Sequence, residues 1–328
     1  MTPRPELAAA TPDDAAPRYA AIDVGSNTVH LLVAEVVAGV WPEPLFRQRA
    51  FVQLGQDVSQ RGEIGVRRRE LAARALAQQV EAARRAGVCA IAIGATEALR
   101  AAANGAEVAD RLAAAADQPV RILPAGDEAA LAFAGATAGL PPATPTLLLD
   151  IGGASTQLAV GRVGRLEHVD SLRVGSGSVA QLAIGDPPTA AEWRAMERCV
   201  AERLPELRPV TGSVLALGTG GTITNLPRLE GPPAATTLGP VAVERILERL
   251  RREPLAELRA RSGVEPERIR LCRGGILILA QLLDLLQIER LRLSERGLRD
   301  GMIAALARKG ADWWREPAAA GIVGTGRG

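Results

Sequence analysis

The feature that most constrains this chain is a short pattern that occurs twice. Residues 20–28, AAIDVGSNT, and residues 147–156, LLLDIGGAST, each join an apolar run to an aspartate, a glycine-containing turn and small hydroxyl residues. Apolar residues follow both, so each stretch predicts a strand, a tight turn and a returning strand. Helical patterns follow each start. The sequence therefore predicts two related α/β halves that face each other across a cleft, where ligands commonly bind.

The two turns are candidate phosphate sites. Turn amides and hydroxyls bind phosphate oxygens, and an adjacent acid such as Asp23 or Asp150 can hold a metal ion. The predicted phosphate-binding residues are Gly25, Ser26, Asn27 and Thr28 in the first turn, and Gly152, Gly153, Ala154, Ser155 and Thr156 in the second. Either turn alone is better explained as an ordinary hairpin, because glycine turns are common. Both together, in the same order, favour the phosphate hypothesis.

Three further stretches could serve the same site. Arg100 falls in the first turn of a predicted helix after a buried strand, where its guanidinium could offer donors to phosphate or simply be solvated. Glu128 lies in the first turn of another helix, where it either complements the helix dipole or acts as a general base on water. A glycine-rich turn between a strand and a helix outlines an anion or nucleotide site without P-loop spacing. Its residues are Gly218, Gly220, Gly221 and Thr222.

Composition excludes several classes of function. The net charge is +2 and aromatic residues make up 2% of the 328 residues, which argues against a nucleic-acid partner. Three widely spaced cysteines indicate neither a disulfide framework nor a zinc site and fit a reducing, cytoplasmic compartment. The most apolar run, residues 274–288, is too short and too polar to span a membrane. The two histidines, His30 and His168, have no partners at metal or triad spacing, and we expect His30 to be structural.

The chain divides into four predicted parts. Residues 1–18 are expected to be a disordered leader, residues 19–140 the first domain, residues 141–312 the second domain after a proline-rich linker, and residues 313–328 a flexible tail. The last predicted helix, residues 297–309, is a candidate to complete the first domain. The other main helices are predicted at residues 64–85, 107–116, 127–137, 190–207, 241–251 and 266–286, and strands at 45–52, 88–95, 120–123, 166–174, 213–217 and 289–293.

These stretches, in this order, resemble the exopolyphosphatase/guanosine pentaphosphate phosphohydrolase (Ppx/GppA) family. IDVGSNTVHLLVAEV looks like the family's first phosphate motif and DIGGASTQL like its second. TEALRAAAN is similar to the TSAxRxAxN segment, and GDEAALAFAG aligns with the segment that carries the catalytic glutamate. LGTGGTIT and SERGLRDGMI resemble later signatures. The resemblance covers Tyr19 to about Lys309 and corresponds to the short, two-domain form of the family.

The resemblance carries expectations about fold and activity. It implies two ribonuclease H-like domains of the actin, sugar kinase and heat-shock chaperone superfamily. It implies that Glu128 activates water for attack on a terminal phosphate, and that Arg100 and the two turns hold the chain end. Asp150, with Asp23, would organise Mg²⁺. The implied reaction releases phosphate from inorganic polyphosphate, or converts guanosine pentaphosphate to tetraphosphate, in an enzyme that could be a homodimer.

Three departures from the family pattern matter for the implied chemistry. Gln157 stands where the family usually has glutamate, so it is a weaker candidate ligand for Mg²⁺. Ala154 replaces the third glycine of the same motif, and Ala130 replaces an arginine that commonly follows the catalytic glutamate. The first two motivate an alternative hypothesis, a polyphosphate- or alarmone-binding protein with weak or no catalysis. A sugar or acetate kinase is a third hypothesis, supported only by the glycine-rich turn.

Overall fold

The first part of the chain forms a five-stranded mixed sheet. The structure is a computed structural model that describes residues 16–37, 41–204, 214–231 and 235–315. Within these residues the strands of the first sheet are β1 (Arg18–Val24), β2 (Thr28–Glu35), β3 (Glu43–Phe51), β4 (Ala90–Ala95) and β5 (Arg121–Ile122). Their spatial order is β3-β2-β1-β4-β5. The first three are antiparallel neighbours, whereas β4 and β5 run parallel to β1.

A second sheet repeats this plan. Its strands are β6 (Pro145–Ile151), β7 (Thr156–Arg162), β8 (Arg165–Leu172), β9 (Leu215–Thr219), β10 (Thr237–Leu238) and β11 (Leu291–Leu293). The spatial order β8-β7-β6-β9-β11 matches that of the first sheet, with β10 added at the edge. Here too the first three strands are antiparallel and the next two run parallel to the central strand. The repetition confirms the predicted α/β class with two related halves.

Helices cover the outer face of the first sheet. They are α1 (Leu54–Arg61), α2 (Val66–Arg85), α3 (Glu97–Ala101) and α4 (Gly105–Ala116). Leu76, Val80 and Ala83 lie at helical spacing on α2 and are buried against Ile22 and Leu31 of the sheet, because a helix with one apolar stripe is stable only when that stripe is covered. The opposite face packs against α12 (Leu298–Lys309). We call this sheet with these five helices the first lobe.

The second sheet has its own helical layer. It contains α6 (Ser176–Ala180), α7 (Ala190–Arg203), α8 (Leu226–Glu230), α9 (Pro240–Arg252), α10 (Leu255–Ser262) and α11 (Pro266–Leu285). Trp193, Ile246 and Ile276 come from three of these helices and join one buried cluster with Leu149 of the sheet. We call this sheet with these helices the second lobe. None of the helices described is both long and apolar enough to cross a bilayer.

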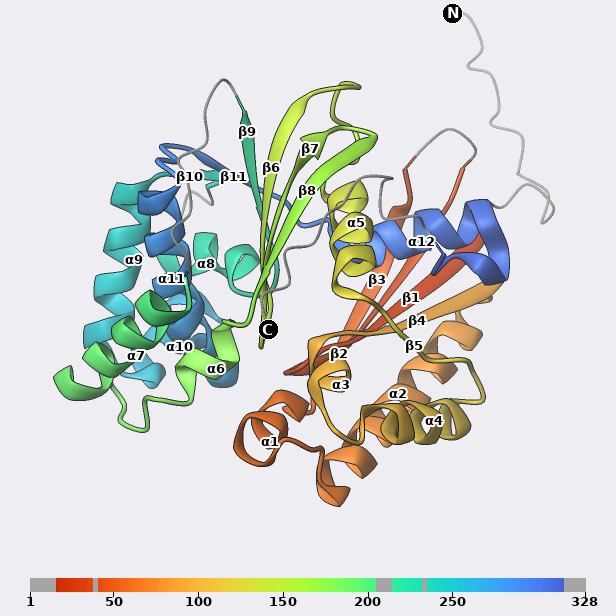
Figure 1. Cartoon of the computed structure of the whole chain (residues 1–328), viewed down its shortest axis with the longest axis horizontal. Helices are drawn as coiled ribbons and strands as arrows, with labels where there is room; N and C mark the ends of the chain where they lie inside the picture. The colour runs from red at the N-terminus through yellow and green to blue at the C-terminus, as the bar shows by residue number, and fades with distance from the viewer. Residues whose placement is uncertain (1–15, 38–40, 205–213, 232–234, 316–328) are drawn as a thin grey trace, which may run out of the picture.

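Two helices lie between the sheets (Figure 1). One is α12, and the other is α5 (Ala125–Ala136), which buries Phe133 against the second sheet while Leu131 joins the cluster of the first. The two helices approach closely at glycines. A Cβ on Gly135 would lie 2.0 Å from the Gly297 carbonyl oxygen, and one on Gly301 would lie 1.9 Å from the Leu131 carbonyl oxygen. The lobes therefore share a close-packed helix pair behind the cleft.

Several sequence predictions need correction. Residues 297–309 fell within the predicted second domain and were also a candidate to complete the first; α12 packs on the first sheet, so the second alternative is correct and the lobes are not consecutive stretches of chain. Arg18, assigned to the leader, begins β1 and forms an ion pair with Glu35 at 3.1 Å. Trp313, assigned to the tail, is buried against the first lobe because its indole ring adds to that core. Residues 1–15 and 316–328, the rest of the predicted leader and tail, lie outside the described residues.

Some short elements were not predicted at all. These are α1, α8, α10 and β10. Helix α1 begins at the buried Leu54 and is held by Asp57, which accepts hydrogen bonds from the Gly65 amide and the Arg68 guanidinium, at 2.9 and 2.8 Å. A helix of eight residues gives little periodicity to detect, and tertiary contacts of this kind supply its stability.

Candidate active site

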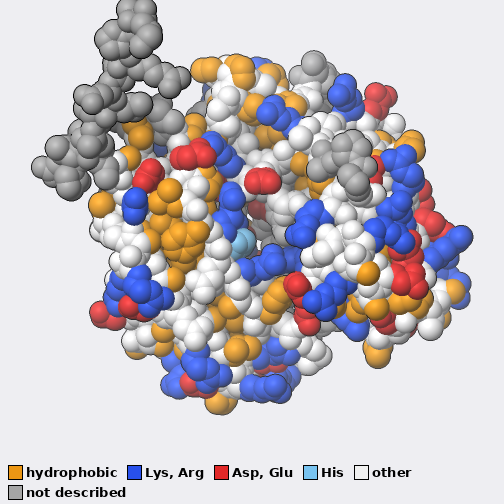
Figure 2. Space-filling view, turned by 180° about the vertical axis from the view of Figure 1, so that it is seen from behind, with side chains coloured by type: hydrophobic (Ala, Val, Ile, Leu, Met, Phe, Trp, Pro, Cys, Tyr) orange, Lys and Arg blue, Asp and Glu red, His pale blue; other side chains and the backbone are white. Residues whose placement is uncertain are grey.

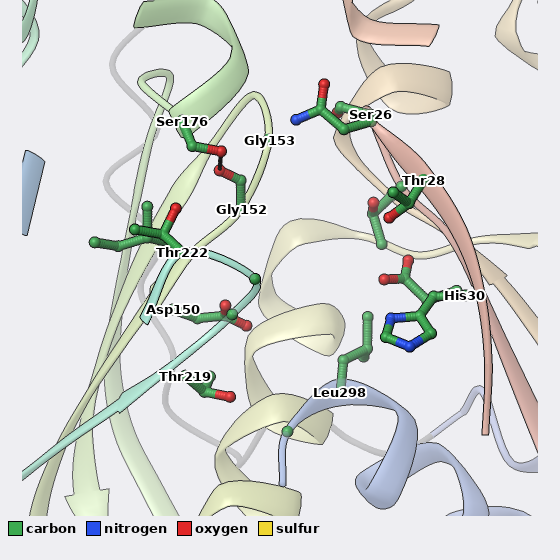
Figure 3. Close-up of a pocket in the computed structure, with 18 of the residues that line it drawn as sticks. Ser26, Thr28, His30, Asp150, Gly152, Gly153, Ser176, Thr219, Thr222 and Leu298 are labelled. Atoms are coloured by element: carbon green, nitrogen blue, oxygen red, sulfur yellow. Dashed lines mark hydrogen bonds between the residues drawn. The ribbon is translucent and has the colours of Figure 1, made fainter. Parts of the chain in front are cut away.

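The candidate site is a pocket of about 270 Å³ that is lined by residues of both lobes. Figure 3 shows that both turns face it, with the Asp150 carboxylate directed into the space between them. Of the turn residues predicted from the sequence, those that line the pocket are Gly25, Ser26, Asn27, Thr28, Gly152, Gly153, Ala154 and Ser155. The structure therefore brings together two motifs that are far apart in the sequence.

The first turn reaches across the cleft. The Gly25 amide donates to the Thr28 carbonyl at 2.9 Å and closes the turn between β1 and β2. The Asn27 side chain then lies against two glycines of the second lobe. A Cβ on Gly153 would lie 2.4 Å from Asn27 Nδ2, and one on Gly177 would lie 2.8 Å from the same atom. Only residues without a side chain fit there, because a real Cβ does not approach another atom so closely.

The second turn is fixed by its own hydrogen bonds. The Gly152 amide donates to the Ser155 carbonyl at 2.9 Å, and Ser176 Oγ donates to the Gly152 carbonyl at 3.0 Å (Figure 3). Gln157 lines the pocket and donates through Nε2 to Ser155 Oγ at 3.0 Å. Thr156 points the other way and donates its hydroxyl hydrogen to the Val174 carbonyl at 2.7 Å, so it does not line the pocket. Strand alternation explains this outcome.

Three carboxyl groups line the pocket together. Burial raises the pKa of Asp23 to about 6, with an opposing effect from Arg299. Burial, reinforced by the negative charge of Asp23, raises the pKa of Asp150 to about 6. Burial also raises the pKa of Glu128 to about 8, although Arg100 acts in the opposite direction. A carboxylate with a raised pKa is a stronger base, so Glu128 has the property that a general base needs.

Arg100 lies behind these carboxyl groups rather than in the pocket lining. Its Nη1 donates to Glu128 Oε2 at 3.0 Å and to the Leu123 carbonyl at 2.6 Å. Its Nε and Nη2 donate to Glu97 Oε2 at 3.1 and 2.6 Å. The guanidinium thus orients Glu128, whereas the sequence suggested that it faces phosphate directly. Direct contact between Arg100 and substrate stays a prediction.

A row of side chains crosses the first sheet, and sequence reasoning predicted Asp23 for the site but missed its neighbours. Asp23 pairs with His30 in the β1–β2 register, and His30 pairs with Arg49 in the β2–β3 register. All three line the pocket, so His30, for which we expected a structural role, also borders the candidate site. Burial and the nearby arginines lower the pKa of His30 to about 2, so its imidazole is neutral. Alternation from Thr28 to His30 was the signal that could have placed it on this face.

Basic side chains border the pocket. Figure 2 shows a histidine in a hollow on the rear face, with Lys and Arg side chains beside it. The arginines that line the pocket are Arg47, Arg49, Arg268 and Arg299. Two of them, Arg49 and Arg268, lie over the Phe51 ring at 5.4 and 5.5 Å from its centroid, an arrangement that stabilises a cation through the ring electrons. These arginines come from three different elements, so no local motif predicted them.

The glycine-rich turn enters the pocket only in part. Gly220, Gly221 and Thr222 line it, together with Thr219, which the sequence did not suggest. Gly218 precedes Thr219 on β9 and packs against Leu291 instead, because successive strand residues face opposite sides of the sheet.

The donor set fits a hard divalent cation. Asp23 Oδ1 is buried and has no hydrogen-bond partner among the described residues, and Asp150 faces the same space. In the described part of the chain no three His, Cys, Asp or Glu side chains are grouped to hold a metal alone. Mg²⁺ does not need such a cage, because it commonly binds one or two carboxylates and takes its other ligands from water and substrate phosphates.

Comparison with known proteins gives a consistent result. The model of the Ppx/GppA phosphatase family matches residues 32–309. Exopolyphosphatase 2 of Mycobacterium tuberculosis H37Rv is 30% identical over 317 residues, which covers 88% of this chain and 98% of the relative. Exopolyphosphatase 1 of Mycobacterium leprae is 26% identical over 301 residues, with coverage of 87% and 88%.

Solved structures share the fold. The Aquifex aeolicus Ppx/GppA phosphatase, in its type II variant, superposes with a TM-score of 0.68 at 25% identity and covers 88% of this chain and 99% of that one. An exopolyphosphatase from Cytophaga hutchinsonii superposes with a TM-score of 0.77 at 21% identity, with coverage of 89% and 98%. The two-lobed actin-like arrangement expected from the sequence is therefore shared with solved proteins over almost the whole described chain.

Proposed function

Because the chain belongs to the Ppx/GppA phosphatase family, we propose that it hydrolyses phosphoanhydride bonds and releases terminal phosphate from inorganic polyphosphate. The observation that carries the proposal is the single pocket in which Glu128 and Asp150 meet both turns. Small hydroxyl residues, exposed backbone amides and arginines suit a chain of phosphates. A carboxylate with a raised pKa beside them suits the activation of water.

The reaction follows from these positions. The Glu128 carboxylate accepts a proton from a water molecule as the water oxygen attacks the terminal phosphorus. The bond from phosphorus to the bridging oxygen breaks, and its electron pair stays with the shortened chain. Hydroxyl and amide donors of Ser26, Thr28 and Ser155 would hold the transferred group, since positioning and charge stabilisation dominate phosphoryl transfer.

Mg²⁺ belongs to the same proposal. Asp150 and Asp23 would hold the ion, and Gln157 could add only a neutral amide oxygen. When bound, the ion would neutralise charge on the phosphate oxygens and relieve the repulsion between the two buried carboxylates.

Two finer points also stand as proposals. Guanosine pentaphosphate is an alternative substrate, because its phosphoanhydride presents the same terminal phosphate to the pocket. We further propose a cytoplasmic homodimer; three free cysteines, Cys89, Cys199 and Cys272, are compatible with a reducing compartment.

A second candidate function is phosphate-chain binding with little catalysis. It is favoured by Gln157, whose amide is already used to hold Ser155 and supplies no negative charge for a cation. A turnover assay separates the two functions: many phosphates released per enzyme, well above background, exclude the binding-only candidate.

Phosphate release from polyphosphate and from guanosine pentaphosphate, measured with Mg²⁺, tests the proposal. Glu128→Ala should reduce turnover by at least about a thousandfold while phosphate binding and folding are retained. The surface variant Glu244→Gln, on an exposed face of α9, should leave the rate unchanged. Full activity of Glu128→Ala on both substrates would rule out the mechanism.

A further inference from the structure

The Arg100 guanidinium has almost no donors left. It carries five N–H groups. Two are taken by Glu97 Oε2, one by the Leu123 carbonyl and one by Glu128 Oε2, at distances from 2.6 to 3.1 Å. One N–H on Nη2 remains. With one free N–H group, the Arg100 guanidinium cannot donate the two parallel hydrogen bonds by which an arginine binds a phosphate.

Glu97 accepts two of these four hydrogen bonds from the Arg100 guanidinium. It accepts from both Nε and Nη2, and the two side chains lie three residues apart on α3, where helical geometry places them side by side. Both are mostly buried, with 14% and 21% of their side-chain surfaces exposed. The pair is therefore held more firmly than an ion pair on the surface. Glu97 and Glu128 line the pocket, and Arg100 lies behind them.

Position 97 also differs from the segment to which this stretch is similar. In the similar segment TSAxRxAxN, a serine stands before the alanine, where this chain has TEALR. A serine hydroxyl is too short to span Nε and Nη2 of an arginine one helical turn away. Glutamate at position 97 adds a carboxylate to one side of the pocket, whereas glutamine at position 157 supplies no carboxylate on the other side.

We propose that Glu97 is a positioning residue. Its hydrogen bonds to Arg100 keep the guanidinium bonded to Glu128 and prevent it from binding the substrate. This inference rests on the proposed function. With Glu97 in place, Arg100 Nη1 donates to Glu128 Oε2 and fixes the orientation of this carboxylate in the pocket lining. Without Glu97, the freed Nε and Nη2 donors form a fork that phosphate can accept, and Glu128 loses its fixed orientation.

The test compares Glu97→Ser and Glu97→Gln with wild type. Glu97→Ser should lower kcat for polyphosphate by about tenfold, the size of effect expected when a catalytic group is misplaced. The same variant should bind inorganic tripolyphosphate several-fold more tightly in metal-free calorimetry, because Arg100 becomes available. Glu97→Gln keeps one acceptor oxygen and should restore part of both properties. Glu107→Ser is the matched control, since Glu107 also lies in the first turn of a helix and pairs with an arginine, Arg69, outside the pocket.

The two measurements separate the possible failures. An unchanged kcat in Glu97→Ser would overturn the inference, and so would tripolyphosphate affinity that is unchanged or weaker. If wild type releases no phosphate, the proposed function fails instead, and the calorimetry still decides whether Glu97 withholds Arg100. A tenfold loss of kcat in Glu107→Ser would also count against it, because the effect would then follow from any lost ion pair.

Discussion

The two lobes carry equivalent rows of residues with opposite character. In the first lobe, Asp23 on β1 is paired with His30 on β2, and His30 with Arg49 on β3. At the equivalent place in the second lobe, Asp150 on β6 is paired with Gln157 on β7, and Gln157 with Ser171 on β8. The same backbone arrangement therefore gives one wall rich in ionisable groups and another that is neutral apart from Asp150 and Arg268.

The difference shows how two lobes with the same fold can take different parts in one reaction. The first wall, taken with Glu128 from α5, carries two carboxyl groups whose pKa values are raised toward neutral pH, Asp23 and Glu128, whereas the second wall carries one, Asp150. The second wall holds glycines and hydroxyl groups, which allow phosphate oxygens to approach the backbone closely. Changes in protonation of the first wall should therefore alter the rate with pH. Substitutions in the second wall should instead alter how closely the substrate fits.

Among the effects that distinguish the two walls, the largest is expected in the pH dependence of the rate. Burial raises the pKa of Glu128 to about 8, so kcat/KM for polyphosphate should rise about tenfold per pH unit well below that value, or about fiftyfold from pH 6 to 8. Asp23 and Asp150, with pKa values of about 6, lose most of their protons by about pH 7, so the upper part of this range reports Glu128. A rate measured across pH 6 to 9 at saturating Mg²⁺ checks the prediction, and a flat profile would contradict the role of Glu128.

Next in size is a steric change on the neutral wall. Gly153→Ala places a Cβ 2.4 Å from Asn27 Nδ2, so the Asn27 amide must move and the contact between the lobes opens. We expect kcat/KM to fall about tenfold, with no change in the shape of the pH profile. Gly25→Ala is the matched variant, because its Cβ would lie 3.3 Å from the Thr28 carbonyl oxygen, which is tight but tolerable. A larger loss in Gly25→Ala than in Gly153→Ala would reverse the comparison.

A smaller effect concerns stability. The pKa of Glu128 is raised in the folded protein, so between its ordinary value of 4.5 and about 8 the folded state binds more protons than the unfolded state. Wild type should therefore lose stability as pH rises through this window, by up to about 1.4 kcal/mol per unit of pKa difference. Glu128→Gln cannot titrate and should lose less. The difference in Tm between the two, measured without metal at pH 5 and pH 8, should shift in favour of the variant at pH 8. An identical shift in both proteins would show that Glu128 is not the group responsible.

Much of this arrangement could be predicted from the sequence, because the signals are local. Each turn lies within a few residues, and the order of apolar runs predicted the two halves and their facing motifs. The exclusion of Thr156 from the pocket was also within reach, since strand alternation separates it from Ser155 and Gln157. The helical spacing of Glu97 and Arg100 was a further local signal that the prediction did not use.

The remaining features depend on contacts between distant residues. Arg49 enters the row with Asp23 only through the register of three strands, and Arg268 arrives from α11 in the other lobe. Arg100 is turned from the pocket partly by the Leu123 carbonyl, which lies beyond α4. Such placements follow from tertiary packing, which no residue pattern near these positions encodes.

The smallest expected effect tests whether the neutral wall can be made more like the charged one. Gln157→Glu puts a carboxylate opposite Asp150 in the strand register, so Mg²⁺ should bind more tightly and the rate at low Mg²⁺ should rise severalfold. In the absence of Mg²⁺ the new charge should raise the pKa of Asp150 further, because two carboxylates would then share one buried site. Gln157→Ala, which removes the hydrogen bond to Ser155 without adding charge, is the control and should lower the rate. Titration of activity against Mg²⁺ for the three proteins decides the matter: an unchanged Mg²⁺ requirement in Gln157→Glu would mean that position 157 does not face the ion.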